Sequence, residues 1–343
     1  MSSRAGTGEE LQGGSFRAGG SEGPAKKLAR TGTRARLTHR LGDRIFNGIT
    51  FLFAGGLGLL VVSMLIQFVY SSRLPIQKFG IAFLWTQIWD PVTEKFGAIA
   101  FIYGTIASSL IALLISIPIS VGLAIFLVEQ APQKVANPIA FIVQLLAAIP
   151  SVVYGLWGIF VLAPLLRDRV YPVIESTLGF LPIFKGPQNG LGLLTAGLIL
   201  SIMIVPIITA ISTDILRAVP NTQREAALAL GATKWEAVQI VLQNARSGIT
   251  GAVILGLGRA IGETMAVTML IGNRPEIAAS LFAPSFTIAS AIANEFTEAT
   301  SEMYRQSLIE LGIVLFVITF IINTLARVLV WSVTRGKGKG TNA

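Results

Sequence analysis

The sequence predicts an all-α membrane protein that crosses the bilayer six times, and three observations support this fold class. Of the 343 residues, 52% are hydrophobic and only 13% are charged. The mean hydropathy of +0.69 is too high for a water-soluble protein of this length. Several apolar runs exceed the roughly 18 residues that mark a spanning helix. Because a backbone in lipid must satisfy its own hydrogen bonds, the spans are expected to be helices.

The segment before the first apolar run, residues 1–44, is rich in Gly, Ser, Thr, Arg and Lys. It buries too little apolar surface to fold, so we expect a disordered basic cytoplasmic tail. It also lacks the short apolar core and the small-residue cleavage site of a signal peptide. The lone histidine, His39, lies in this tail and is expected to be solvated, and the chain has no cysteine. We therefore predict no metal site.

The predicted membrane domain covers residues 45–335, and a second basic cytoplasmic tail, 336–343, follows it. Pro118 lies inside the long second run, while Pro150 and Pro206 are expected to bend or break the third and fourth spans. The expected spans are residues 45–70, 97–128, 138–162, 191–216, 248–271 and 308–332.

Lys and Arg are unevenly distributed between the segments that join the spans. They gather before the first span, between the fourth and fifth spans, and after the sixth. Because cytoplasmic loops are enriched in these residues, we expect both termini to be cytoplasmic. This distribution explains the net charge of +9 through anionic lipid rather than through nucleic acid.

A compact polar segment, 221–231, separates the fourth span from the fifth. It contains Glu225, Ala226 and Ala227, whose small alanine side chains permit close approach, and it ends at Gly231, which has the character of a helix C-terminal cap. A membrane chain has no structural need for a short helix here. We therefore predict a docking element for a partner outside the membrane. The alternative is an interfacial helix that lies on lipid.

Two charges interrupt the apolar run of the fifth span. Arg259 and Glu263 are four residues apart, so they are expected to share one helix face, and Gly256, Gly258 and Gly262 remove side-chain bulk beside them. A charge at membrane depth usually marks a transport path. A guanidinium fits a tetrahedral oxyanion, and Glu263 can hold Arg259 or accept a proton from the substrate. A structural ion pair is the alternative interpretation.

Several motifs resemble those of known permeases. The Glu-Ala-Ala, three residues, Gly pattern at 225–231 is similar to the coupling motif of ABC importer permeases, although Gln243 and Asn244 stand where that family usually has a proline. Three longer segments resemble the PstC-type permeases of high-affinity phosphate importers, and the resemblance covers about 45–335. These segments are Ile-Pro-Ser-Val-Val-Tyr-Gly at 149–155, Gly-Arg-Ala-Ile-Gly-Glu-Thr-Met-Ala-Val at 258–267 and Ala-Asn-Glu-Phe at 293–296.

The resemblance implies a type I ABC importer permease in the plasma (inner) membrane. It implies that Arg259 and Glu263 lie on the phosphate path, and Ser151 is a further candidate because its hydroxyl can donate to a dehydrated anion. The candidate coupling residues of 221–231 would dock on an ATPase dimer. A second homologous permease and an external phosphate-binding protein would complete the assembly.

The chain has no Gly-x-x-x-x-Gly-Lys-Ser/Thr phosphate loop. The resemblance places ATP and Mg on the partner ATPase, so this chain is expected to be a transport subunit and not an enzyme.

Three other functions remain open at this point. The first is an ABC permease for another oxyanion, sulfate or molybdate; an acceptor such as Glu263 favours phosphate, because protonated phosphate donates a hydrogen bond and sulfate does not. The second is a secondary transporter driven by an ion gradient, which predicts inverted repeats or buried carboxylates in several spans. The third is a membrane scaffold, which leaves Arg259 and Glu263 unexplained.

Overall fold

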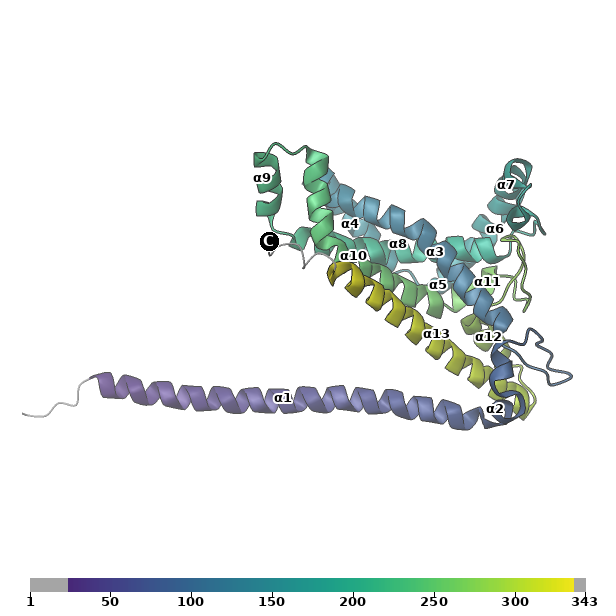
Figure 1. Ribbon diagram of the computed structural model, residues 1–343, viewed down its shortest axis with the longest axis horizontal. Helices are drawn as coiled ribbons and strands as arrows, with labels where there is room; N and C mark the ends of the chain where they lie inside the picture. Colours follow the sequence, from purple (N-terminus) through teal and green to yellow (C-terminus); the bar gives the residue numbers. More distant parts are fainter. Residues whose placement is uncertain (1–23, 336–343) are drawn as a thin grey trace, which may run out of the picture. The chain divides into compact units, whose positions relative to one another are not determined.

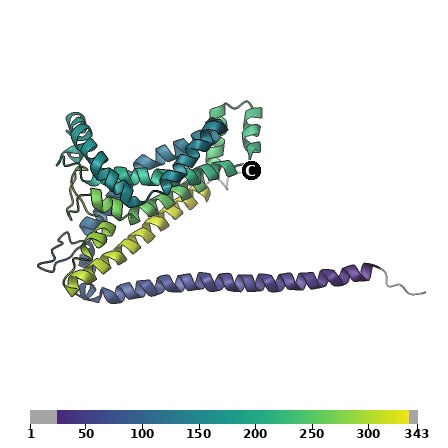
Figure 2. The same ribbon diagram turned by 180° about the vertical axis from the view of Figure 1, so that it is seen from behind.

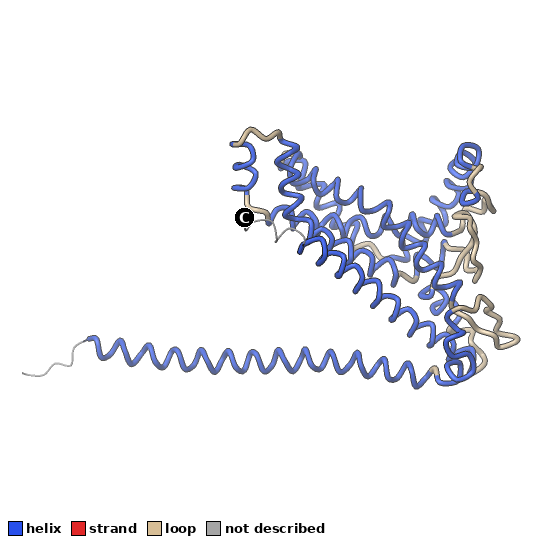
Figure 3. Tube along the Cα trace, viewed as in Figure 1, coloured by secondary structure: helices blue, strands red, loops and turns tan. Residues whose placement is uncertain are grey.

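The computed structural model describes residues 24–335, and the regular structure in this range is helical apart from two isolated β-bridges (Figure 3). Six helical stretches are long and apolar enough to cross a membrane. The prediction of an all-α protein with six spans is therefore confirmed. The stretches are Arg44–Ser71, Ile99–Gln130, Ser151–Leu178, Leu193–Ala218, Lys234–Gly262 and Glu302–Val328.

Residues up to 64 form one compact unit and residues from 65 onward form a second, and each is described by itself. Short π-helical turns (η2 to η4) and 3-10 turns (η1 and η5) join several of the α-helices. The elements are α1 (Pro24–Ser71), α2 (Arg73–Phe79), η1 (Gly80–Leu84), α3 (Ile99–Ile125), η2 (Phe126–Gln130), α4 (Gln133–Ala147), α5 (Ser151–Trp157), η3 (Gly158–Leu162), α6 (Ala163–Leu165), η4 (Leu166–Val170), α7 (Tyr171–Leu178), η5 (Pro182–Phe184), α8 (Leu193–Ala218), α9 (Asn221–Ala229), α10 (Lys234–Gly262), α11 (Met265–Leu270), α12 (Ile288–Glu295) and α13 (Glu302–Arg335).

The N-terminal tail departs from the expected disorder, because α1 begins at Pro24 and continues without a break to Ser71. Proline is well tolerated in the first turn of a helix, where no backbone N–H bond is needed. The Ala, Leu, Lys and Arg residues between 25 and 44 are strong helix formers, and they extend a helix that the next apolar segment already nucleates. Residues 1–23 and the C-terminal tail 336–343 lie outside the described residues.

The third span lies further along the chain than the sequence predicts. α4 ends at Ala147, and α5 starts at Ser151 after a break in the helix at Pro150. Pro150 has φ −58° and ψ 140°, a conformation that a proline ring favours and that a helix cannot continue. The candidate span on this side of the break is the helical run Ser151–Leu178. The expected span 138–162 instead crosses the break, so it includes part of α4 and part of α5.

Helix α8 forms the centre of the bundle and is the most deeply buried of the six candidate spans. It packs between α3 and α10 (Figures 1 and 2). Gly197 of α8 is so close to α3 that an added Cβ would lie 2.5 Å from Ile111. Gly256 of α10 likewise lies against Ile208 of α8, at 2.8 Å from an added Cβ. Small residues at these contacts let the helix backbones approach closely.

The second unit has two distinct ends, with α9 at one end and α2, α7 and α12 at the other (Figures 1 and 2). The end that carries α12 holds an aromatic cluster that includes Phe96, Trp89 and Tyr304. Within it, Glu295 of α12 accepts hydrogen bonds from Trp89 Nε1 at 2.7 Å and from the Tyr304 hydroxyl at 2.8 Å. Burial raises the pKa of the Glu295 carboxyl above its ordinary value. Glu295 of the Ala-Asn-Glu-Phe motif therefore links α12 to α13 and to the loop that carries Trp89.

Candidate coupling helix and membrane-embedded charges

The predicted docking element forms a defined helix, α9, with a structured end. The N–H of Gly231 donates to Leu228 O at 3.0 Å, and the N–H of Ala232 donates to Ala227 O at 3.1 Å. Gly231 has φ +85°, a left-handed conformation that glycine adopts without a Cβ clash. This pair of bonds is the Schellman motif that closes a helix. The expected capping role of Gly231 is confirmed, and its role in docking stays a prediction.

The surface of α9 is divided between a packed side and an open side. Ala227 is buried, whereas Glu225 and Ala226 are exposed. Beside them, Leu230 is 90% exposed and Trp235, at the start of α10, is 57% exposed. Large apolar side chains at that exposure, next to a short rigid helix, form a surface that a protein partner can cover.

A second helix start follows α9 directly and fixes its position. Thr233 accepts the N–H of Glu236 at 3.3 Å, and Glu236 Oε2 accepts the N–H of Thr233 at 2.7 Å, which is a capping box. Asn244 of α10 donates to Gln223 Oε1 of α9 at 2.6 Å. α9 is therefore held against α10 as a helix-turn-helix rather than left as an independent loop.

One arginine attaches α9 to the membrane-spanning helices. Arg224 contacts Glu129 of η2, with Nη2 at 2.6 Å from Oε1 and Nε at 3.1 Å from Oε2. The same guanidinium donates to Leu216 O at 3.2 Å and to Val219 O at 3.1 Å, at the end of α8. The side chains of Arg224 and Glu129 are only 17% and 11% exposed. Removing one partner of such a pair costs roughly 3–5 kcal/mol.

Sequence reasoning missed the contact between Arg224 and Glu129. The two residues are 95 positions apart in the chain, with eight helical elements between them, and neither position has a motif that points to the other. The available signal in the sequence was a carboxylate directly after the second apolar run, on the side of the membrane where Arg224 is also expected. We call this group of bonds the Arg224 anchor.

The expected pairing of Arg259 with Glu263 was wrong. α10 ends at Gly262, and Glu263 has φ −70° and ψ 128°, which is extended backbone. Within the described part of the chain, neither side chain forms a hydrogen bond or an ion pair with another residue.

The side of α10 that carries Arg259 is open. Arg259 is exposed, and a Cβ added at Gly258 or Gly262 would meet nothing within 4 Å. An adjoining face of the same turn is packed, since Gly256 and Ala260 are buried. An exposed guanidinium within a spanning helix is unfavourable in lipid, so protein or water must cover this side of α10.

Two helix breaks are brought together next to these charges. α5 follows the break at Pro150, α11 follows the break at Glu263, and α5 and α11 pack against each other. At Gly155 an added Cβ would lie 2.5 Å from Met269 Sδ of α11, so a larger residue would displace the Met269 side chain from this contact. Broken helices of this kind bind ions and substrates in membrane transporters.

Two further residues of the segment 149–155 bear on this site. The Tyr154 hydroxyl donates to Leu146 O at 2.8 Å. Ser151 begins α5 and is partly exposed. No hydrogen bond joins Ser151 to Arg259 or Glu263 across residues 24–335. Its assignment to the path stays a prediction.

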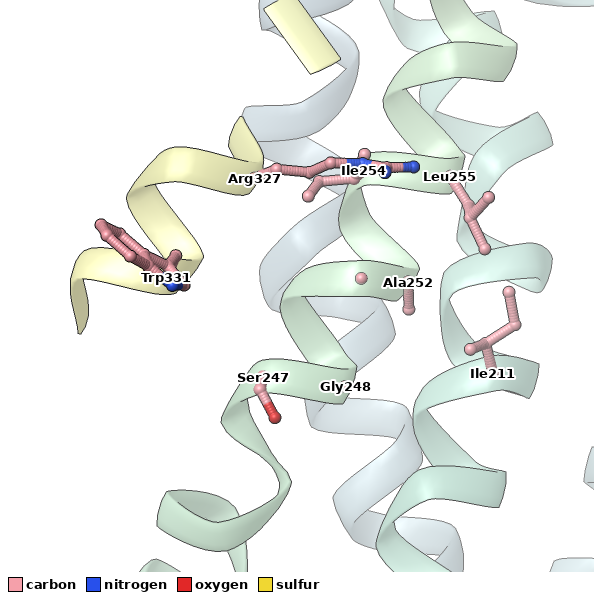
Figure 4. A pocket seen from close by; sticks show the side chains of 9 residues that line it. Ile211, Ser247, Gly248, Ala252, Ile254, Leu255, Arg327 and Trp331 are labelled. Carbon is pink, nitrogen blue, oxygen red and sulfur yellow. The ribbon is translucent and has the colours of Figure 1, made fainter. Parts of the chain in front are cut away.

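A groove runs along α10 beside the open side (Figure 4). Its first part, of about 580 Å³, is lined by Gly248 and Ala252 of α10 and by Ile211 of α8. Arg327 extends from α13 toward Ile254 of α10 at its edge (Figure 4). A second part, of about 600 Å³, includes Gly258 and so adjoins Arg259. Small residues along a spanning helix permit another helix to pack closely.

Comparisons with known proteins agree with one another. The family model "Binding-protein-dependent transport system inner membrane component" matches residues 116–335. The phosphate transport system permease protein PstC of Mesorhizobium japonicum is 46% identical over 320 residues, which cover 92% of this chain and 97% of that relative. PstC of Haemophilus influenzae is 46% identical over 302 residues, which cover 87% of this chain and 96% of that relative.

A solved structure shows the same fold. It is a bacterial ABC transporter involved in the import of the acidic polysaccharide alginate, and it is 17% identical with a TM-score of 0.51. The match covers 81% of this chain and 96% of that one.

Proposed function

Because this chain belongs to the family of binding-protein-dependent transport system inner-membrane components, with PstC-type permeases as its relatives, we propose that it is the membrane-spanning permease subunit of an ATP-driven importer of inorganic phosphate. It is a multi-pass protein of the inner membrane. The substrate passes by alternating access, in which the path opens to one side of the membrane at a time.

The unpaired guanidinium of Arg259 is the observation that carries the phosphate assignment. It is exposed on a spanning helix, beside two glycines that leave open space. A planar guanidinium donates paired hydrogen bonds to an oxyanion, and these bonds are stronger away from bulk water. A second homologous permease covers the open side of α10 and supplies the other half of the pore.

Glu263 and Ser151 support the choice of phosphate among oxyanions. The carboxylate of Glu263 is free to accept a hydrogen bond from a protonated phosphate, which sulfate cannot donate. The hydroxyl of Ser151 provides a donor at the neighbouring helix break. Both residues lie at backbone breaks: Glu263 directly follows the last residue of α10, and Ser151 is the first residue of α5.

The coupling role belongs to α9 and its exposed surface. Glu225, Ala226 and Ala227, with the Gly231 cap, dock in a groove of one subunit of an ATPase dimer. ATP and Mg bind to that dimer, and this chain contributes no ATPase site. Through the Arg224 anchor, a displacement of α9 is passed to the ends of α3 and α8.

The remaining partners follow from this arrangement. An external phosphate-binding protein delivers the anion at the end of the bundle opposite α9. Both termini and α9 then face the cytoplasm. Closure of the ATPase dimer moves α9 and opens the paired permeases outward, and ATP hydrolysis resets them inward.

The proposal is tested by ATP-dependent uptake of labelled phosphate into vesicles that contain the whole assembly. We expect uptake that requires ATP hydrolysis and is not reduced by an excess of sulfate or molybdate. Uptake driven by an ion gradient without ATP would identify a secondary transporter. Equal competition by sulfate would assign the permease to another oxyanion.

A further inference from the structure

A carboxyl group far from the proposed path has no partner. Glu310 lies in α13 and is only 8% exposed, and its Oε2 atom forms no hydrogen bond in the described part of the chain. No ion pair to Glu310 exists there either. An ionised carboxyl group buried without a partner is costly, so Glu310 either keeps its proton or is stabilised by a cationic group from outside these residues.

Glu310 lines an apolar cavity of about 490 Å³ at the end of the bundle opposite α9. The walls come from the end of α1, from α2 and η1, from the start of α3 and from α13. Isoleucine, leucine and valine make up most of the lining, and Glu310 is the only ionisable residue in it. A ligand for this cavity therefore needs a long apolar part and a single cationic group.

The apolar part of the lining forms a stripe along one helix. On α13 the cavity is lined by Glu310, then by Ile313, Val314, Val317 and Ile321. This spacing keeps them on one helix face, and eleven residues of helix rise by about 16 Å. An extended hydrocarbon chain fits along such a stripe, with its polar end at Glu310.

The position of the Glu310 carboxyl group along α13 is consistent with the boundary between lipid head groups and hydrocarbon. Trp85, which lines the mouth of the same cavity, is 73% exposed, and tryptophan is enriched at that boundary. Glu310 lies about 12 Å along α13 from Glu302, whose side chain forms an exposed pair with Arg305. The polar end of a lipid is found at this depth.

We propose that this cavity binds one phospholipid whose head group carries a primary ammonium. The ammonium donates hydrogen bonds to the carboxylate of Glu310, and one acyl chain lies along the stripe from Ile313 to Ile321. A choline head group has no N–H to donate, so it does not replace the ammonium. The lipid holds η1 and α3 against α13 at the outer end of the subunit.

The test uses native mass spectrometry of the complete purified importer, placed in nanodiscs of equal ethanolamine and choline phospholipid. We expect the wild type to retain ethanolamine lipid over choline lipid by about tenfold or more, as for a hydrogen bond to a charged group. Glu310→Gln should bring this ratio close to one. That variant removes a buried charge, so it should not lower the yield of the complex.

Two matched variants separate the head group from the acyl chain. Glu298→Gln removes an exposed carboxylate nearby and should leave the ratio unchanged. Val317→Trp should reduce retention of both lipids, because Val317 is 46% exposed and a larger side chain there fills the stripe without entering the core. Equal retention of the two lipids by the wild type, an unchanged ratio in Glu310→Gln, or a cavity filled by a neighbouring subunit would overturn the proposal.

Discussion

Arg224 and Arg259 differ in how far their guanidinium groups are buried and in how many hydrogen-bond partners they have. Arg224 is almost buried and has every direction of its guanidinium occupied by Glu129, Asn221 and two backbone carbonyls. Arg259 is exposed and has no partner within the described residues. The first arrangement fixes a helix in place, and the second leaves donors available for a ligand. A permease needs both, since force must pass through a rigid contact to a site that can exchange its contents.

The strongest test of this contrast is Arg259→Ala in the complete importer. We expect phosphate uptake to fall by about 100-fold or more, because a charge-assisted contact with the anion is lost. The yield of assembled complex should stay unchanged, since Arg259 forms no hydrogen bond or ion pair within residues 24–335. Arg274→Ala removes an exposed arginine outside the spans and serves as the control. Normal uptake by Arg259→Ala would remove this residue from the path.

The converse test breaks the Arg224 anchor. Arg224→Ala leaves Glu129 and two backbone carbonyls of the α8 end without their donor, which should destabilise the position of α9 by roughly 3–5 kcal/mol. We expect uptake to fall by about tenfold or more while basal ATP hydrolysis persists. ATPase rate and phosphate uptake should be measured on the same vesicles.

The exposed pair Arg305–Glu302 provides the matched control for the anchor. Its side chains are 51% and 57% exposed, and such pairs contribute about 1 kcal/mol or less. Arg305→Ala should therefore leave both rates close to those of the wild type. Equal defects in the two variants would mean that burial of the Arg224 anchor has no special role.

The sequence predicted the six spans well because hydropathy alone determines which segments can lie in lipid. It drew the third span across a helix break, since a hydropathy window does not register that one helix ends before Pro150 and the next begins after it. It also carried the fifth span past Glu263. The break there accompanies the packing of α11 on Gly155 of α5, a long-range contact that a local pattern does not contain.

The site was predicted unevenly for a related physical reason. Arg259 was identified because a charged residue within an apolar run can be recognised from the linear sequence alone. Glu129 and Arg224 were missed because each lies at the end of an apolar run, where a charge is ordinary. Their significance depends on mutual burial, which only the folded chain defines.

Substitutions at Gly231, at the end of α9, are expected to have a smaller effect on phosphate uptake. They test whether α9 must keep a rigid end for coupling. Gly231→Pro removes the N–H that donates to Leu228 O and cannot adopt φ +85°. Gly231→Asn keeps the donor and tolerates the left-handed conformation. We expect uncoupling of ATP hydrolysis from uptake in the proline variant and near-normal uptake in the asparagine variant. Similar uptake by both would show that the cap is not needed for coupling.

Glu295 offers the mildest test, because it is a half-buried carboxyl group held by neutral donors instead of a cation. Burial raises the pKa of its carboxyl, although the hydrogen bonds from Trp89 and Tyr304 oppose this. The folded protein thus keeps the proton at a pH where the unfolded chain has lost it. Its contribution to stability is present at low pH and falls as the pH rises through the folded pKa.

We expect Trp89 fluorescence and thermal stability to change together over that pH range, and Glu295→Gln to remove this dependence. Glu298→Gln removes an exposed like charge that adds to the rise in the pKa of Glu295, so it should weaken this dependence without removing it. If the pH dependence survives in Glu295→Gln, the titrating group is another residue. The carboxyl group of Glu295 would then stay ionised in the folded protein, as we expect for Glu129 beside Arg224.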